Sequence, residues 1–140
     1  MAAAAPPVPP LSAYSRRRKC AWFPRYLPPG ARVLEVGCGD GWFLRHLRRH
    51  GWPEARGIDL APPADIVGDI CDWHALGLER GRFDAIVAFE VLEHVDFLDA
   101  AHALLRPGGR LLLSTPAPET DGICWLLERA GLAQPRTTPH

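Results

Sequence analysis

Three glycines at alternate positions follow a short apolar segment, and no other feature of the chain constrains its fold as much. Residues 32–36 are mostly apolar, Gly37, Gly39 and Gly41 follow, and a helical pattern starts at Trp42. Glycine can take positive φ angles and leaves no Cβ in the way of a ligand. A strand, a glycine loop and a helix in this order predict an open α/β sheet, which binds ligands at the carboxyl ends of its strands. By itself, the loop would also suit a tight turn that binds nothing.

Short apolar runs alternate with helical patterns along the rest of the chain, and this alternation favours a parallel sheet with crossover helices. We expect strands at residues 32–36, 55–60, 65–67, 83–89 and 110–114. We expect helices at residues 42–50, from a cap at Asp96 to a break at residues 107–109, and at residues 122–130. The predicted fold class is therefore α/β, with an open, mostly parallel sheet and helices on both faces.

Residues 1–25 are expected to form a disordered, Pro-rich and basic tail before a single domain at residues 26–140. The first ten residues lack the charged and apolar regions of a secretory signal. The formal net charge of the chain is zero, yet residues 1–34 hold six of the sixteen basic residues and no acidic residue. A solvated, flexible segment explains this composition. Contact with a phosphate-bearing substrate or an anionic surface is the alternative.

Composition argues against several other classes of protein. Apolar residues make up 47% of the 140 residues, but no apolar run approaches the roughly 20 residues of a membrane-spanning helix. The four cysteines, at positions 20, 38, 71 and 124, lack the spacing of a zinc site and are expected to be free thiols. The sequence holds no nucleic-acid-binding motif. We therefore expect a cytoplasmic protein without a membrane or nucleic-acid partner.

An acidic residue at the end of the second expected strand strengthens the ligand-binding interpretation. Asp59 lies 18 residues after Gly41. A carboxylate in this position can accept hydrogen bonds from ribose hydroxyls. The third glycine comes one position earlier than in the G-x-G-x-x-G pattern, which argues against a nicotinamide-dependent dehydrogenase.

The segment from Glu35 to Gly41 resembles motif I of the class I S-adenosylmethionine-dependent methyltransferases. Later segments resemble that family in the same order, at residues 56–59, 66–70, 83–95 and 104–114. The resemblance implies a Rossmann-like fold and S-adenosylmethionine as the cofactor. The family's sheet has seven strands. Because this chain supplies five, we expect its C-terminal hairpin to be missing.

The resemblance also assigns cofactor contacts to residues near the strand ends. Glu35 would reach the methionyl amino group, Asp59 the ribose hydroxyls and Asp69 the adenine amino group. The remaining contacts would come from Gly37, Cys38, Gly39, Gly41, Leu60, Ile70, Phe89 and Glu90.

Residues 90–94, Glu-Val-Leu-Glu-His, resemble a segment of ubiquinone-biosynthesis O-methyltransferases and of small-RNA 2′-O-methyltransferases. In both groups such residues can hold a divalent cation. The same string also occurs in methyltransferases without a known metal, and no second histidine follows the fifth expected strand until His140. We therefore predict Glu93 and His94 as candidate catalytic residues and expect no metal. The other interpretation is that both residues pin the loop to the sheet by hydrogen bonds.

The resemblance thus implies methyl transfer from S-adenosylmethionine to an acceptor, expected to be a small molecule, by in-line displacement. The alternative is a non-catalytic domain that keeps the fold and binds the cofactor or a partner. Glu35, Asp59 and Asp69 favour retained cofactor binding, whereas the short C-terminal part favours lost turnover. We expect a monomer or weak self-association.

Overall fold

The computed structural model describes Ala4, residues 6–92, residues 94–115 and Ala130. Its strands are β1 (Val33–Val36), β2 (Arg56–Asp59), β3 (Ile66–Val67), β4 (Phe83–Phe89) and β5 (Leu105–Ser114). Its α-helices are α1 (Pro10–Trp22), α2 (Trp42–Arg49) and α3 (Leu98–Leu104). Two short 3-10 helices complete the described elements, η1 (Phe23–Tyr26) and η2 (Ile70–Asp72).

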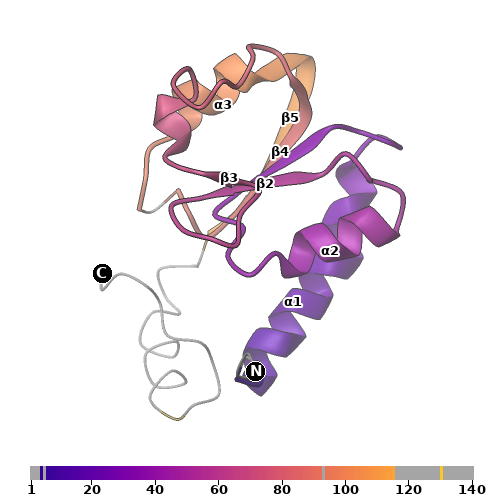
Figure 1. Cartoon of the computed structure of the whole chain (residues 1–140). Coiled ribbons are helices and arrows are strands. Elements are labelled where there is room, and N and C mark those ends of the chain that lie inside the picture. Colours follow the sequence, from indigo (N-terminus) through magenta and orange to yellow (C-terminus); the bar gives the residue numbers. More distant parts are fainter. Residues whose placement is uncertain (1–3, 5, 93, 116–129, 131–140) are drawn as a thin grey trace.

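The five strands form one parallel sheet with the order β3-β2-β1-β4-β5. In Figure 1, α1 and α2 lie on one side of the sheet and α3 lies on the other. This arrangement confirms the predicted α/β class with an open parallel sheet covered on both faces. The strand order reverses between β1 and β4, and sheets of this kind bind ligands at such a point.

Two apolar clusters attach the helices to the two faces of the sheet. The cluster on the α3 side includes Leu34, Val36, Ile86, Phe97 and Leu104. The cluster on the α2 side includes Val33, Val87, Phe43, Leu44 and Leu47. Neighbouring residues of β1 and β4 therefore point into opposite clusters, as expected for central strands covered on both faces. Both strands are thus packed on both faces, and this packing positions the residues near their carboxyl ends.

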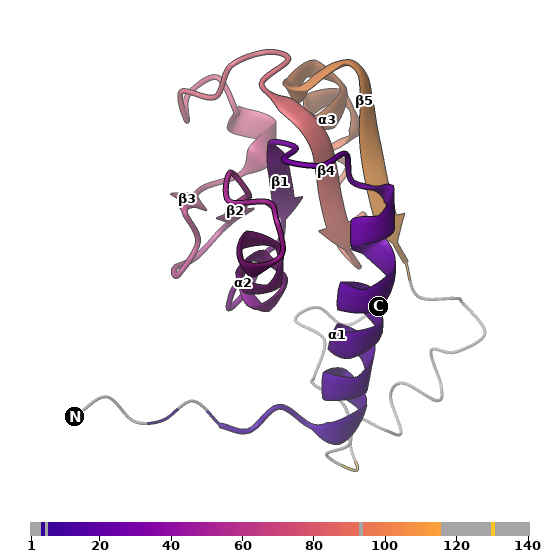
Figure 2. The same cartoon turned by 90° about the vertical axis from the view of Figure 1, so that its right-hand side faces the viewer.

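Residues 10–25 correct the prediction of a disordered tail, because they form α1 and most of η1. Proline suits the first turn of α1, where a backbone N–H would have no partner within the helix. Figure 2 shows α1 along its length beside α2, which is seen nearly end-on, and the two helices are in contact. Cys20 and Phe23 pack against the cluster on the α2 side. The helix was missed because none of its side chains is fully buried, so its sequence shows no clear apolar stripe.

The other expected elements are found with shifted ends. Strand β4 has the predicted bounds. Strand β5 begins at Leu105 and not at residue 110 as expected, because residues 107–109 belong to the strand and a shift in register accommodates them. Helix α3 begins at Leu98 without a side-chain cap at its N-cap residue, Phe97. The Asp96 carboxylate still accepts a 3.3 Å hydrogen bond from the backbone N–H of Leu98. Apart from Ala130, the helix expected at residues 122–130 lies outside the described residues, as does any C-terminal hairpin.

Two further sequence predictions concern membrane helices and thiols. In the part of the chain that the structure describes, no helix has the length and apolar character needed to cross a membrane. Cys20, Cys38 and Cys71 are free thiols, as predicted. Cys124 lies outside the described residues.

Candidate functional site

The glycine loop lies at the carboxyl end of β1 and leads into α2. Gly37, Gly39 and Gly41 have φ angles of 72°, 54° and 80°, which side-chain-bearing residues rarely adopt. The backbone N–H of Gly37 donates to the carbonyl of Ile58 at 2.8 Å, and that of Gly39 donates to Asp59 Oδ2 at 2.8 Å. The end of β2 therefore holds the loop in its left-handed conformation.

The glycines border different surroundings. A Cβ at Gly37 would approach Val91 Cγ2 at 2.7 Å, so Gly37 is needed for packing against the segment after β4. A Cβ at Gly39 would meet no heavy atom within 4 Å. The bare backbone of Gly39 therefore borders open space, as a loop that receives a ligand requires.

Cys38 lies between these two glycines but points into the core. It is 2% exposed and belongs to the cluster on the α2 side. Burial, with a smaller contribution from the charge of Glu35, raises the pKa of the Cys38 thiol to about 11. A contact between Cys38 and a cofactor would therefore come from its backbone.

Asp59 ends β2 directly beside the glycine loop. Its Oδ2 accepts from the N–H of Gly39, and its Oδ1 accepts from the N–H of Leu60 at 2.7 Å. Each carboxylate oxygen has a second lone pair, so the group can still accept hydrogen bonds from two hydroxyls. The Leu60 side chain is 70% exposed. The structure thus brings together Gly39, Asp59 and Leu60, three of the residues predicted to contact the cofactor.

Asp69 and Ile70 follow β3 at the same edge of the sheet. Asp69 Oδ1 accepts a 2.8 Å hydrogen bond from the N–H of Cys71, which places the carboxylate at the start of η2. Ile70 is 4% exposed and packs in the cluster on the α3 side. Its side chain is held in the core, so its backbone is the part that a ligand could contact.

The end of β4 combines an aromatic cluster with an unusual backbone conformation. The Phe89 ring stacks on Trp42 with centroids 5.6 Å apart, and its edge contacts with Phe43 and Phe23 span 4.9 and 4.8 Å. Glu90 follows with a φ of 59°, and its N–H donates to the carbonyl of Ser114 at 2.7 Å. Positive φ at a non-glycine residue costs energy and is found disproportionately at functional sites.

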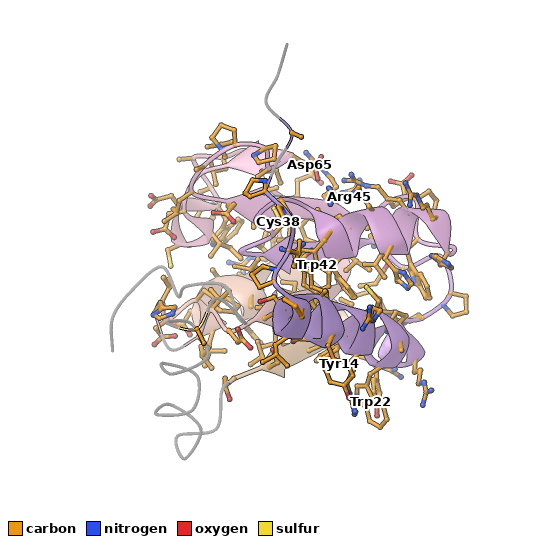
Figure 3. All side chains as sticks on the ribbon, turned by 90° about the horizontal axis from the view of Figure 1, so that it is seen from below. Tyr14, Trp22, Cys38, Trp42, Arg45 and Asp65 are labelled. Carbon is orange, nitrogen blue, oxygen red and sulfur yellow. The ribbon has the colours of Figure 1, made fainter. Side chains whose placement is uncertain are left out.

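Helix α1 brings two basic side chains to the same end of the sheet. Arg16 Nη1 lies 3.1 Å from Asp40 Oδ2 in the glycine loop, and Lys19 Nζ lies 3.4 Å from Glu90 Oε1. Arg16 also lies over the ring of Trp42. In Figure 3, Trp42 lies between α1 and α2, whereas Tyr14 and Trp22 project from the opposite side of α1. One face of α1 thus closes over the glycine loop and the end of β4.

The sequence pattern predicts no specific role for Arg16 or Lys19. The sequence offered one signal, charge, because residues 1–34 hold no acid, whereas the predicted site contains Asp59 and Glu90 and the glycine loop contains Asp40. Opposite charges on two segments favour their association, but they do not specify which residues meet.

Glu35 is a buried acidic residue, 1% exposed, and it is the next-to-last residue of β1, near the carboxyl end of the strand. Its Oε2 has no hydrogen-bond partner among the described residues. Burial raises the pKa of this carboxyl to about 8, and the negative charges of Asp40 and Asp59 contribute in the same direction. The charge of Lys19 opposes them. A buried acceptor without a partner is costly, so Oε2 is a candidate contact for a donor group of a ligand.

The predicted catalytic pair is only partly described. Glu93 lies outside the described residues, and His94 lies in a turn where its N–H donates to the carbonyl of Val91 at 2.9 Å. Within the described ranges, no group of three or more His, Cys, Asp or Glu side chains could hold a metal ion.

The sequence of this chain is similar to that of known methyltransferases. A family model described as a methyltransferase domain matches residues 11–137. A ubiquinone biosynthesis O-methyltransferase from Xanthomonas axonopodis pv. citri is 38% identical over 109 residues, which cover 65% of this chain and 45% of that protein. The chain therefore spans less than half the length of this relative.

The fold is similar to that of solved methyltransferases. A SAM-dependent methyltransferase from Archaeoglobus fulgidus matches with a TM-score of 0.64 at 20% identity, over 86% of this chain and 62% of that one. An S-adenosylmethionine-dependent methyltransferase from Mesorhizobium loti matches with a TM-score of 0.58 at 27% identity, over 74% of this chain and 56% of that one. Because the family model spans nearly the whole chain, α1 included, the chain belongs to the methyltransferase-domain family.

Proposed function

We propose that this chain binds S-adenosylmethionine at the carboxyl ends of β1, β2 and β4 and forms the cofactor-binding core of a small-molecule methyltransferase. The observation that carries the proposal is the pairing of Gly39 with Asp59. The carboxylate holds the N–H of Gly39 at 2.8 Å, beside backbone that borders open space. A nucleoside ribose and its attached chain need an oriented acceptor of this kind beside a bare backbone.

The other described residues fit the same ligand. Glu35 offers a buried acceptor without a partner, which suits a cationic amino group. Asp69, at the start of η2, is an acceptor for the adenine amino group, and Phe89 and Glu90 border the methionyl part. Gly37 and Gly41 keep the loop in the conformation that exposes Gly39.

The proposed chemistry requires positioning more than acid or base catalysis. When bound, the cofactor supplies a methyl group on a sulfonium, whose leaving group is a neutral thioether. The chain must hold the reacting atoms in line at about 3 Å and keep water away. The carboxylates at the strand ends would fix the cofactor, and α1, held by Arg16 and Lys19, would cover it.

The acceptor is proposed to be a small molecule because the relative from Xanthomonas is named as an O-methyltransferase of ubiquinone biosynthesis. We keep Glu93 and His94 as candidate catalytic residues that act without a metal. Turnover of the full-length protein should therefore survive exhaustive chelation. Loss of turnover that magnesium, manganese or zinc restores would contradict this expectation.

Calorimetric titration of the 140-residue chain with S-adenosylhomocysteine, and separately with NAD, tests the proposed function. Binding of S-adenosylhomocysteine without binding of NAD is expected. Binding of neither ligand by the folded protein would refute the proposal. Turnover of the full-length protein on a panel of small acceptors then separates an enzyme from a domain that binds the cofactor without catalysis.

A further inference from the structure

The buried carboxyl of Glu35 is the starting point. It is 1% exposed and its Oε2 accepts no hydrogen bond from the described residues. Burial, with one oxygen lacking a hydrogen-bond donor, disfavours the ionised carboxylate, so the protonated form is favoured until a positive group arrives. The ligand-free protein therefore holds a proton that an exposed glutamate would have lost at neutral pH.

The charged groups that act on Glu35 come from three elements. Asp40, in the glycine loop, and Asp59, at the end of β2, disfavour its ionisation. Lys19, on α1, favours it. The pKa values of the Cys20 and Cys38 thiols are also raised. Burial is the main cause for each thiol, and a negative charge on Glu35 acts in the same direction. The positive charge that favours ionisation of Glu35 thus lies on α1, whereas the two carboxylates that disfavour it lie in the glycine loop and at the end of β2.

Lys19 is held in place by several contacts at the end of β4. Its side chain is 16% exposed, its Nζ lies 3.4 Å from Glu90 Oε1, and it lies 5.0 Å from the centroid of the Phe89 ring. Phe23, one turn further along, packs edge-on against the same ring at 4.8 Å. The ammonium is therefore fixed beside the strand that pairs with β1 at Glu35.

We propose that Lys19 is a positioning residue for cofactor binding, because it supports the charge that Glu35 acquires when a cationic ligand enters and Glu35 releases its proton. The inference rests on the proposed function, since S-adenosylmethionine and S-adenosylhomocysteine both carry an ammonium group. The proton balance is simple. Neutral Glu35 and the cationic ligand become an ion pair, and one proton passes to the buffer.

The first test is calorimetric titration of the 140-residue chain with S-adenosylhomocysteine at pH 7, in buffers of different ionisation enthalpy. The wild-type chain should release about one proton per ligand bound, because Glu35 is mostly protonated beforehand. Glu35→Gln cannot release this proton, so its binding enthalpy should not depend on the buffer. Binding without proton release by the wild-type chain, or equal release by Glu35→Gln, would overturn the inference and leave the proposed function intact. If S-adenosylhomocysteine does not bind at any pH, both fall.

The second test isolates Lys19. The dissociation constant of the wild-type chain should fall by up to about tenfold per pH unit from pH 6 to pH 8 and then level off. In Lys19→Met, the pH at which the dissociation constant levels off should be higher, because no neighbouring cation favours the ionisation of Glu35. Binding at pH 7 should be weaker by about threefold or more. Lys19→Arg should restore the wild-type profile.

The matched control is Arg18→Met, which removes one charge from the exposed outer face of α1, where Arg18 contacts the Tyr14 hydroxyl at 3.2 Å. For this variant, the dissociation constant should level off at the same pH as for the wild-type chain. Thermal melting confirms that each variant is folded, and Lys19→Gln replaces Lys19→Met if the latter is not. A neutral Lys19 variant that binds with the wild-type pH profile would remove Lys19 from the proposal.

Discussion

The two ends of the central strand pair, β1 and β4, differ in the number of hydrogen-bond donors around their carboxyl groups. At the amino end, Asp84 is surrounded by donors. It accepts from the N–H of Arg32 at 2.7 Å, from Arg106 Nε at 2.7 Å and from the Arg32 guanidinium at 3.3 Å. At the carboxyl end, the Oε2 of buried Glu35 has no partner among the described residues. At one end the carboxylate has its donors within the fold, and at the other a buried oxygen has no donor among the described residues.

The pKa values of the two carboxyls shift in opposite directions because one carboxyl has hydrogen-bond donors around it and the other is buried. The hydrogen bond from the Arg32 side chain is the main cause that lowers the pKa of Asp84, and Arg106 adds to it. Burial raises the pKa of Glu35 to about 8. In a parallel sheet all carboxyl ends meet at one edge, so stabilising contacts and ligand-binding groups can be kept on separate edges. The following variants test this separation.

The largest effect is expected at Gly39. Gly39→Val places a side chain in the space proposed for the cofactor and should abolish S-adenosylhomocysteine binding, which corresponds to at least about a 100-fold loss. The matched control is Gly30→Val, near the amino end of β1. Gly30 also has a positive φ, of 67°, and a Cβ there would also meet nothing within 4 Å.

Both substitutions impose similar backbone strain, so both should lower the melting temperature. Only Gly39→Val should lower the affinity, as measured by calorimetry. If Gly39→Val binds the ligand normally, the loop is only a turn, and the carboxyl end of the strands does not differ from the amino end in ligand binding.

The second effect concerns how the stability of the ligand-free protein changes between pH 4.5 and about 8. Between pH 4.5 and about 8 the folded protein keeps the Glu35 proton, whereas the unfolded chain has lost it. Wild-type stability should therefore fall as pH rises through this window. Glu35→Gln lacks this loss, and between pH 5 and pH 9 it should gain roughly 2–4 kcal/mol relative to wild type. Urea unfolding at several pH values measures the difference, and parallel curves for the two proteins would show that Glu35 ionises without cost.

The third effect compares two carboxylates that each hold a backbone N–H. Asp59→Ala should weaken S-adenosylhomocysteine binding by at least about tenfold, because hydrogen bonds to charged groups contribute roughly 1.5–3 kcal/mol each. Asp65→Ala is the control. Asp65 Oδ2 accepts from Gly57 at 2.8 Å and from Arg48 Nη2 at 2.7 Å, within the fold. It should lower stability and leave affinity unchanged, and an unchanged affinity in folded Asp59→Ala would contradict the ribose assignment.

These comparisons also show which parts of the molecule can be predicted from sequence. The glycine loop and Asp59 were predicted because strand, loop, helix and strand are consecutive, and their pattern is local. The closure by α1 was not predicted, because its contacts are distant in sequence. Arg16 and Asp40 are 24 residues apart, and Lys19 and Glu90 are 71 apart. A run of basic residues without an apolar stripe favours acidic partners but does not indicate which residues they are.

The smallest effect is expected at the amino end of the strands. Asp84→Asn keeps the shape of the side chain but removes its charge, and should lower stability by about 1 kcal/mol at pH 7. Arg32 and Arg106 are 37% and 41% exposed, so both can turn to water and limit the loss. The affinity for S-adenosylhomocysteine should not change.

The pH dependence of this variant should be opposite to that of Glu35→Gln. Because the pKa of Asp84 is lowered from 3.8, its stabilising contribution is present above that pH and is lost as pH falls through the folded-state value. The deficit of Asp84→Asn should therefore be full at neutral pH and shrink in acid, as urea unfolding at pH 7 and in acid would measure. Glu35, by contrast, changes the pH dependence of stability only above its ordinary pKa of 4.5. A loss of cofactor affinity in Asp84→Asn would mean that the amino end also shapes the binding site, through β1 or β4, and the two ends would then have to be treated as one coupled system.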